Sequence, residues 1–325
     1  MKSLKMNNFS LLWIGVCIVS LIISGCGILT QKPLNRPTSV SALPDGSVYI
    51  VDRGNYRVVK MDADGHLDLT FGKLGSGQTD FYRPWDSAVD SDGNIYICNM
   101  VPDEAELQPH EGVKVFDKNG KFLKELGGKD FQPDEERELP YGLDIDDKNR
   151  IFVIYTSIAT LKIFDQDGNE LAKFFGENGT EAGQFQGLID VAVDDERNLV
   201  YLSDQTNSNI QQFELSEDAA KINLVYRQTI GEYGRSLGQF AYPTNLAVDD
   251  ESGNLYVGDM ANQRIQVLDT EGKALMEFMP PNTKVWQVLG LATAAGKVYA
   301  ADPFNNVIWE FDQNGSLLKK LEVKP

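Results

Sequence analysis

The sequence is poor in the residues that build several common kinds of site. Two histidines among 325 residues exclude a metal centre held by three imidazoles. Three cysteines exclude a disulfide framework. Only 30 Lys and Arg oppose 48 Asp and Glu, and the net charge of −18 argues against a nucleic-acid surface, which needs clustered cations to displace counterions from phosphate. The hydrophobic content of 42% is nevertheless enough to bury a large core, which excludes global disorder.

The N-terminus has the pattern of a secretory signal. Lys2 and Lys5 precede residues 9–25, an almost uninterrupted apolar run. At 17 residues the run lies at the short limit for a spanning helix, and it sits directly behind positive charge. These features predict a signal peptide over residues 1–25.

The end of this signal resembles a bacterial lipobox, with an aliphatic residue and two small ones before Cys26. The resemblance implies that Cys26 carries lipid, palmitate included, and becomes the mature N-terminus. The protein is then expected to be a lipoprotein of the cell membrane, facing outside the cytoplasm, at the extracellular face or in the periplasm. Residues 26–36 would form the lipidated start and a tether that reaches at most about 35 Å. The alternative is an ordinary signal anchor with an incidental cysteine.

A strand-like core with one aromatic residue recurs six times along the chain. Ser47–Asp52 and Asn254–Asp259 are two of its copies. The aromatic positions are spaced 47, 56, 49, 55 and 43 residues apart, and one four-stranded propeller blade takes about 40–50 residues. The spacing predicts an all-β, six-bladed β-propeller of four-stranded antiparallel blades over residues 37–325. The aromatic residues are Tyr49, Tyr96, Phe152, Tyr201, Tyr256 and Tyr299.

A tight turn between the third and fourth strands is the clearest marker within a repeat. Asp caps this turn through its side chain and Gly supplies the positive φ that a hairpin needs. A calcium loop would need an acidic residue at its twelfth position, which these segments lack, so we interpret them as hairpins. The turns are Asp62–Gly65, Asp117–Gly120, Asp165–Gly168, Asp269–Gly272 and Asp312–Gly315.

The repeats resemble those of the NHL-repeat family of propellers. The family pattern runs P-x-x-[IL]-A-V-D, I-Y-V-x-D, x-x-N-x-R-[IV] and D-x-x-G, and it matches Pro243–Asp249, Leu255–Asp259 and Asn262–Ile265 well. We interpret the Asp, Asn and Arg of the pattern as structural residues that tie the loop after the second strand to its own blade. The family includes enzymes, ligand sensors and scaffolds, so the resemblance leaves the function open.

The innermost strands should line a central channel. Counting from the proline of the family pattern, the channel-facing positions include Asp86, Asp190 and Asn245, and period-two alternation adds Asp144. Three carboxylates and an amide suit a hard cation such as Ca²⁺. The resemblance extends to two families of six-bladed enzymes, the gluconolactonase-like enzymes and the amidating lyases, which hold a metal ion at this position of the channel. The alternative is a hydrated polar channel whose carboxylates bond to backbone donors and water.

Aromatic and acidic residues are expected around one rim of this channel. Trp85, Tyr141 and Trp286 are candidates for ligand binding, and packing between blades is the alternative for each. Acidic insertions at residues 102–111 and 129–138 are either solvated loops or a docking face for a basic partner or cationic ligand.

No catalytic set emerges from the sequence. The three-histidine zinc site of an amidating lyase cannot form, and a Ser-His-acid triad is improbable with two histidines. We therefore expect a binding or scaffolding module that presents its acidic rim to a protein, peptide or small ligand. The alternative is a Ca²⁺-dependent lactonase or esterase with Asp190 or Asp144 as its base.

Overall fold

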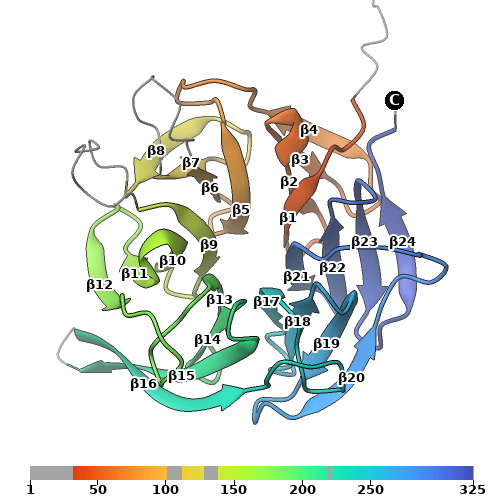
Figure 1. Ribbon diagram of the computed structural model, residues 1–325. Helices are drawn as coiled ribbons and strands as arrows, with labels where there is room; N and C mark the ends of the chain where they lie inside the picture. The colour runs from red at the N-terminus through yellow and green to blue at the C-terminus, as the bar shows by residue number, and fades with distance from the viewer. Residues whose placement is uncertain (1–31, 101–111, 128–137, 219–220, 325) are drawn as a thin grey trace, which may run out of the picture.

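Four-stranded antiparallel sheets, each made of consecutive strands, form the fold. The computed structural model describes residues 32–100, 112–127, 138–218 and 221–324. In these residues it contains 24 strands and two single-turn 3-10 helices, η1 (Arg53–Asn55) and η2 (Thr156–Ile158). The strands form six separate sheets arranged in a ring (Figure 1). The predicted six-bladed β-propeller is confirmed.

Each blade takes four successive strands, numbered from the channel outward. Blade one contains β1 (Pro37–Ala42), β2 (Val48–Asp52), β3 (Arg57–Met61) and β4 (Leu67–Phe71). Blade two contains β5 (Arg83–Val89), β6 (Ile95–Met100), β7 (Gly112–Phe116) and β8 (Phe122–Leu126). Blade three contains β9 (Pro140–Ile145), β10 (Ile151–Tyr155), β11 (Thr160–Phe164) and β12 (Glu170–Phe175).

The second half of the ring repeats this order. Blade four contains β13 (Leu188–Asp194), β14 (Leu199–Asp204), β15 (Asn209–Asp218) and β16 (Lys221–Ile230). Blade five contains β17 (Pro243–Val248), β18 (Leu255–Asp259), β19 (Arg264–Leu268) and β20 (Ala274–Phe278). Blade six contains β21 (Gly290–Ala294), β22 (Lys297–Asp302), β23 (Val307–Asp312) and β24 (Leu317–Leu321).

The core is divided among the blade interfaces. Six clusters of buried apolar side chains occur in the described residues, one between each pair of neighbouring blades. The middle strands of a blade are covered by a neighbour on both faces, so they are apolar throughout rather than alternating. The six recurring aromatic residues are each 0–1% exposed and belong to this core.

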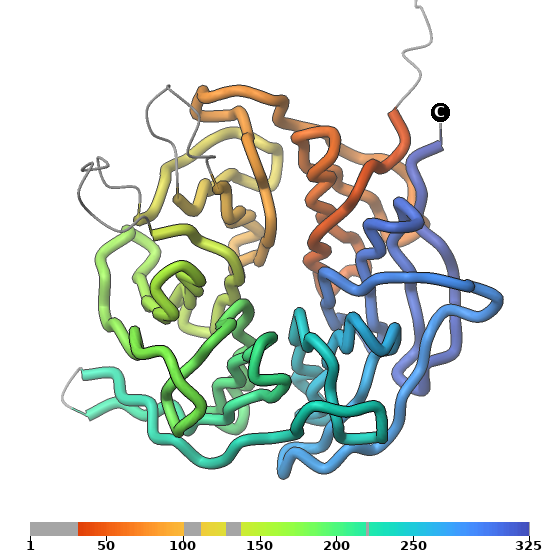
Figure 2. The backbone as a smooth tube through the Cα atoms, viewed as in Figure 1, coloured from red at the N-terminus to blue at the C-terminus, as the bar shows by residue number. Residues whose placement is uncertain are grey.

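The ring closes by packing blade six against blade one. Leu34, before β1, and Val323, after β24, lie in the same buried cluster. The described chain therefore begins and ends side by side (Figure 2). At Gly290 an added Cβ would lie 2.6 Å from the Ser39 Cα, so the first and last inner strands approach at a distance that only glycine allows.

Local hydrogen bonds explain why the repeat motifs recur. In the hairpin that starts at Asp62, the carboxylate accepts the His66 N–H at 2.8 Å and Gly65 has a φ of 86°. In blade five, Asp259 accepts from Arg264 Nε and from Asn262 Nδ2, both at 2.8 Å. The hairpin interpretation and the structural interpretation of Asp, Asn and Arg are both confirmed for these repeats.

Several sequence features lie outside the described residues. These are the predicted signal, Cys26, the first acidic insertion and most of the second. Within the described part of the chain, no helix has the length and apolar character that crossing a membrane requires. Cys98 is a free thiol buried between blades two and three, where burial raises its pKa well above the usual range.

Candidate functional site

Irregular inner strands aim polar side chains at the channel. In β5 the pairing register shifts between Pro84 and Ser87, and in β13 it shifts between Leu188 and Asp190. Such a bulge adds a residue to one strand and turns its side chain out of the regular alternation. Asp86 lies at this bulge, two residues after the proline of its repeat. It faces the channel, as the sequence predicts.

The four residues predicted to bind metal line one cavity. It has a volume of about 530 Å³, and Asp86, Asp144, Asp190 and Asn245 all contribute to its wall. All six innermost strands supply lining residues, so the cavity lies on the axis of the ring. The sequence placed these four residues together correctly.

Each of the three channel aspartates accepts a hydrogen bond from the backbone of the next blade. The carboxylate thus bonds to an inner-strand N–H of the next blade, and it joins the two blades. The same bond recurs at three successive interfaces. The pairs, with their O···N distances, are Asp86–Leu143 (3.0 Å), Asp144–Val193 (2.9 Å) and Asp190–Leu246 (2.7 Å).

Hydroxyl groups make the corresponding links at two of the remaining interfaces. Ser41 and Ser87 join blades one and two through their hydroxyls, 2.6 Å apart. Thr293 Oγ1 donates to the Val248 carbonyl across blades five and six at 2.6 Å. These links could not be predicted from the sequence, because nothing in the pattern of a single strand distinguishes their hydroxyl groups from those of other serines and threonines.

Burial raises the pKa values of the three channel aspartates. It raises the pKa of Asp86 to about 6 and that of Asp144 to about 7. The pKa of Asp190 is raised well above its usual range, by burial first and by the charge of Asp86 second. Asp190 is 3% exposed and its Oδ1 has no hydrogen-bond partner among the described residues. Gly142 leaves room for this atom, which would lie 2.5 Å from an added Cβ.

The channel residues do not fit a single metal ion. In the described part of the chain, acidic and histidine ligand atoms gather within 4.8 Å in groups of three at two places, Asp62–Asp64–His66 and Asp146–Asp147–Asp195. Asp86, Asp144 and Asp190 do not form such a group. One oxygen of each carboxylate instead accepts a backbone N–H of the next blade. A Ca²⁺ ion held jointly by these residues and Asn245 is not the arrangement that this geometry favours.

Acidic side chains surround one end of the cavity. Asp147, Asp195, Glu196 and Asp250 line it from the turns that join the first and second strands of blades three to five. We call these four residues the acidic mouth. Burial, and then the charges of Asp146 and Asp147, raise the pKa of Asp195 to about 7. The acidic mouth thus concentrates negative charge that the fold leaves partly uncompensated.

Two of the predicted aromatic ligand contacts lie at the opposite end of the inner strands. The rings of Trp85 and Tyr141 are 4.6 Å apart, and the Arg53 guanidinium lies 4.6 Å from the Trp85 ring centroid. Neither aromatic residue is in the wall of the central cavity. They form a packed aromatic pair between blades two and three, beneath an arginine of blade one.

Trp286 lies elsewhere, in the core between blades five and six. Its ring is 1% exposed, and Nε1 donates to the Gln263 carbonyl at 2.6 Å. A ligand has no access to a side chain in this position. Trp286 therefore packs between blades, and only Trp85 and Tyr141 remain as candidate ligand contacts.

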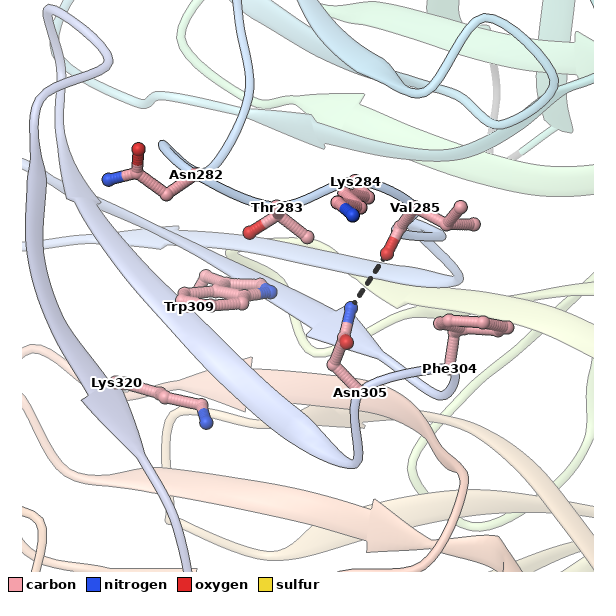
Figure 3. A pocket seen from close by; sticks show the side chains of 8 residues that line it. All are labelled: Asn282, Thr283, Lys284, Val285, Phe304, Asn305, Trp309 and Lys320. Carbon is pink, nitrogen blue, oxygen red and sulfur yellow. Dashed lines mark hydrogen bonds between the residues drawn. The ribbon is translucent and has the colours of Figure 1, made fainter.

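A smaller cavity of about 310 Å³ lies beside blade six (Figure 3). Trp309 and Lys320 form part of its wall, and Phe304 stands at its edge with 58% of its surface exposed. Asn305 Nδ2 bridges to the Val285 carbonyl at 3.0 Å and to Asp302 at 2.6 Å. Asn305 therefore holds the loop of its own blade, as the structural interpretation of this motif expects.

Comparison with known proteins places the repeat in the NHL class. The family model described as NHL repeat matches residues 34–61 and 240–268. The chain is 22% identical to NHL repeat-containing protein 2 of Bos taurus over 307 residues, which is 78% of this chain and 41% of that protein. It is 29% identical to peptidylglycine alpha-amidating monooxygenase of Rattus norvegicus over 220 residues, 65% of this chain and 22% of that protein. The chain thus matches less than half of the length of each relative.

Solved structures support the fold. A gluconolactonase from Xanthomonas campestris superimposes with a TM-score of 0.60 at 14% identity, covering 85% of each chain. At this identity the likeness concerns the propeller alone. The structure shows a six-bladed propeller, and the family-model match shows NHL repeats at two places in it.

Proposed function

We propose that this NHL-repeat propeller is a binding module that takes a cationic group of a protein or peptide partner at its acidic mouth. The observation that carries the proposal is the axial cavity of about 530 Å³, rimmed by Asp147, Asp195, Glu196 and Asp250. A lysine or arginine side chain matches the charge of this cavity, and the cavity has room for it. The repeats and the propeller architecture support binding as the general role.

Electrostatics favours a cation at this place. Carboxylates from neighbouring blades repel one another, and that repulsion contributes to the raised pKa of Asp195. A bound cation removes the repulsion and is attracted by several charges at once. Deeper in the wall of the same cavity, Asp190 adds a carboxyl group whose Oδ1 has no hydrogen-bond partner in the described chain, and which favours a positive charge in the cavity.

Binding of a fluorescein-labelled octalysine peptide tests this proposal. The triple variant Asp147→Asn, Asp195→Asn, Asp250→Asn is expected to bind about fivefold to a hundredfold more weakly, since each lost charge contact contributes about 0.3–1 kcal/mol. Fluorescence anisotropy at 50 mM and 500 mM NaCl measures the affinity. The wild-type affinity should fall with salt more steeply than that of the variant.

The matched control removes the same amount of charge elsewhere. Asp167, Glu181 and Glu271 are exposed and lie outside the cavity wall, so changing all three to the amides preserves the acidic mouth. This control should keep most of the wild-type affinity. If it weakens octalysine binding as much as the first variant does, the peptide responds only to net charge and the proposed site is wrong.

We further propose that the propeller is held at the outer side of a membrane by lipid on Cys26. The apolar run at residues 9–25 and the lipobox-like residues before Cys26 support this arrangement. The variant Cys26→Ser is expected to accumulate as unprocessed precursor and to lose all labelling by radioactive palmitate. Unchanged maturation and labelling would contradict lipidation at this residue.

Binding is favoured over the Ca²⁺-dependent hydrolase that the same carboxylates suggest. In the structure Asp86, Asp144 and Asp190 serve as links between blades, and they do not form one ligand set. Turnover of lactones or esters by the full chain that is lost in Asp190→Asn, with the fold intact, would reverse this preference.

A further inference from the structure

Three arginines converge on the rim opposite the acidic mouth. Arg36 stands immediately before β1, Arg53 starts η1 after β2, and Arg83 is the first residue of β5. All three belong to the end at which the chain enters its inner strands, whereas the acidic mouth lies where those strands end. We call Arg36, Arg53 and Arg83 the arginine rim.

Within the described residues, the arginine rim lacks the carboxylate partners that arginines normally have in proteins. Across the described ranges, none of the ion pairs involves Arg36, Arg53 or Arg83. The arrangement is unexpected in a chain with 48 acidic residues against 30 basic ones. Arg57 and Arg264, by contrast, are each bonded to a buried aspartate of the same blade.

Positive charge is concentrated here at an electrostatic cost. Partial burial and the neighbouring charges of Arg36 and Arg83 lower the pKa of Arg53. The face of the Trp85 ring, 4.6 Å from the Arg53 guanidinium, holds this cation in place and offers a compensating cation–π contact. A packed aromatic pair thus fixes Arg53 among like charges, which is the arrangement expected of a preorganised anion site.

A cavity adjoins this cluster. It has a volume of about 310 Å³, and its wall includes Arg36, Arg53, Gln287 and Asn306 together with the exposed ring of Phe304. Asn306 Oδ1 accepts the Arg36 N–H at 2.7 Å, which anchors the backbone of Arg36 to blade six. The cavity therefore spans the closure between blades six and one, with cations on one side and an apolar ring on the other.

We propose that this cavity binds an oxyanion, a phosphate or carboxylate group, through Arg36 and Arg53 with Arg83 adding to the field. The guanidinium fork presents paired donors that match the oxygens of either group. Gln287 and the Phe304 ring would contact the remainder of the ligand. The anion belongs to a free metabolite or to a lipid headgroup, and the two sources share this chemistry.

Thermal unfolding of the full chain in neutral detergent micelles tests the site. In one arm, sodium phosphate at 10 mM replaces sodium chloride at equal ionic strength. In the other, phosphatidylglycerol replaces phosphatidylcholine as the lipid added to the micelles. A rise in the melting temperature of about 2–4 °C in either arm is expected from an anion present at roughly ten times its Kd. The arm that responds identifies the source of the anion.

Variants link this response to the arginine rim. Arg53→Gln should abolish the rise in melting temperature, and Arg36→Gln, which alters an exposed side chain, should do so without affecting the fold. Arg227→Gln is the matched control, because Arg227 lies on the outer strand β16. The proposal is wrong if neither arm raises the melting temperature of the wild type. It is also wrong if Arg36→Gln and Arg53→Gln retain the rise, or if Arg227→Gln loses it equally.

Discussion

Asp259→Ala is expected to lower the free energy of unfolding by about 3–5 kcal/mol. Asp259 is 0% exposed and accepts hydrogen bonds from Arg264, Asn262, Gln266 and the Ala241 backbone. Its removal leaves the Arg264 guanidinium buried, with only a partly exposed glutamate as counterion. An uncompensated buried charge is among the most destabilising changes that a single substitution makes.

Urea unfolding followed by tryptophan fluorescence measures this loss. Asp68→Ala is the control, since Asp68 pairs with Lys60 at 3.2 Å but its side chain is 56% exposed. Surface pairs of this kind contribute about 0–1 kcal/mol. Equal losses in the two variants would contradict the structural role assigned to the NHL aspartate.

The channel carboxylates should make the protein less stable as pH rises from 5 to 8. An unfolded aspartate has a pKa of 3.8, whereas in the fold the pKa is about 6 for Asp86 and about 7 for Asp144. In this window the folded state holds more protons than the unfolded state, so stability falls with increasing pH. Each pKa unit corresponds to about 1.4 kcal/mol, and the total fall from these two groups amounts to about 3–4 kcal/mol.

Other carboxylates do not obscure this trend. Hydrogen bonds in the exposed hairpins lower the pKa values of Asp62, Asp117 and Asp165. Their stabilising effect is present above pH 4 and is lost only below it, outside the window. Asp195, whose pKa burial raises to about 7, acts in the same direction, so a rise in stability toward pH 5 would report on the carboxyl groups of the whole cavity.

Asp190→Asn provides the matching test. Asp190 Oδ2 accepts the Leu246 N–H, a bond that an asparagine oxygen can keep, and Oδ1 has no hydrogen-bond partner among the described residues. The variant removes the free-energy cost of burying this carboxyl group, whose pKa burial raises, without removing a hydrogen bond to the neighbouring blade, so it should be more stable than the wild type at pH 8. The gain should shrink toward pH 5. A variant that is less stable at pH 8 would show that the ionised carboxylate is compensated.

The sequence by itself determined the architecture. The recurring aromatic residue, the Asp–Gly hairpins and the Asp–Asn–Arg pattern each depend on a few neighbouring residues in one blade. Local hydrogen bonds and strand alternation decide such features, so their spacing was sufficient to predict six blades. The same counting placed Asp86, Asp144, Asp190 and Asn245 in one cavity.

Tertiary structure decided what those side chains contact. Asp86 bonds to Leu143 and Asp144 to Val193, partners 57 and 49 residues away on another blade. Trp286 lies in the core between blades, and Arg36 and Arg83, from two different blades, lie near enough to Arg53 for their charges to affect it. The physical reason is that distances between blades depend on bulges, on the tilt of the sheets and on how apolar faces pack. None of these quantities is encoded in the periodicity of a single strand.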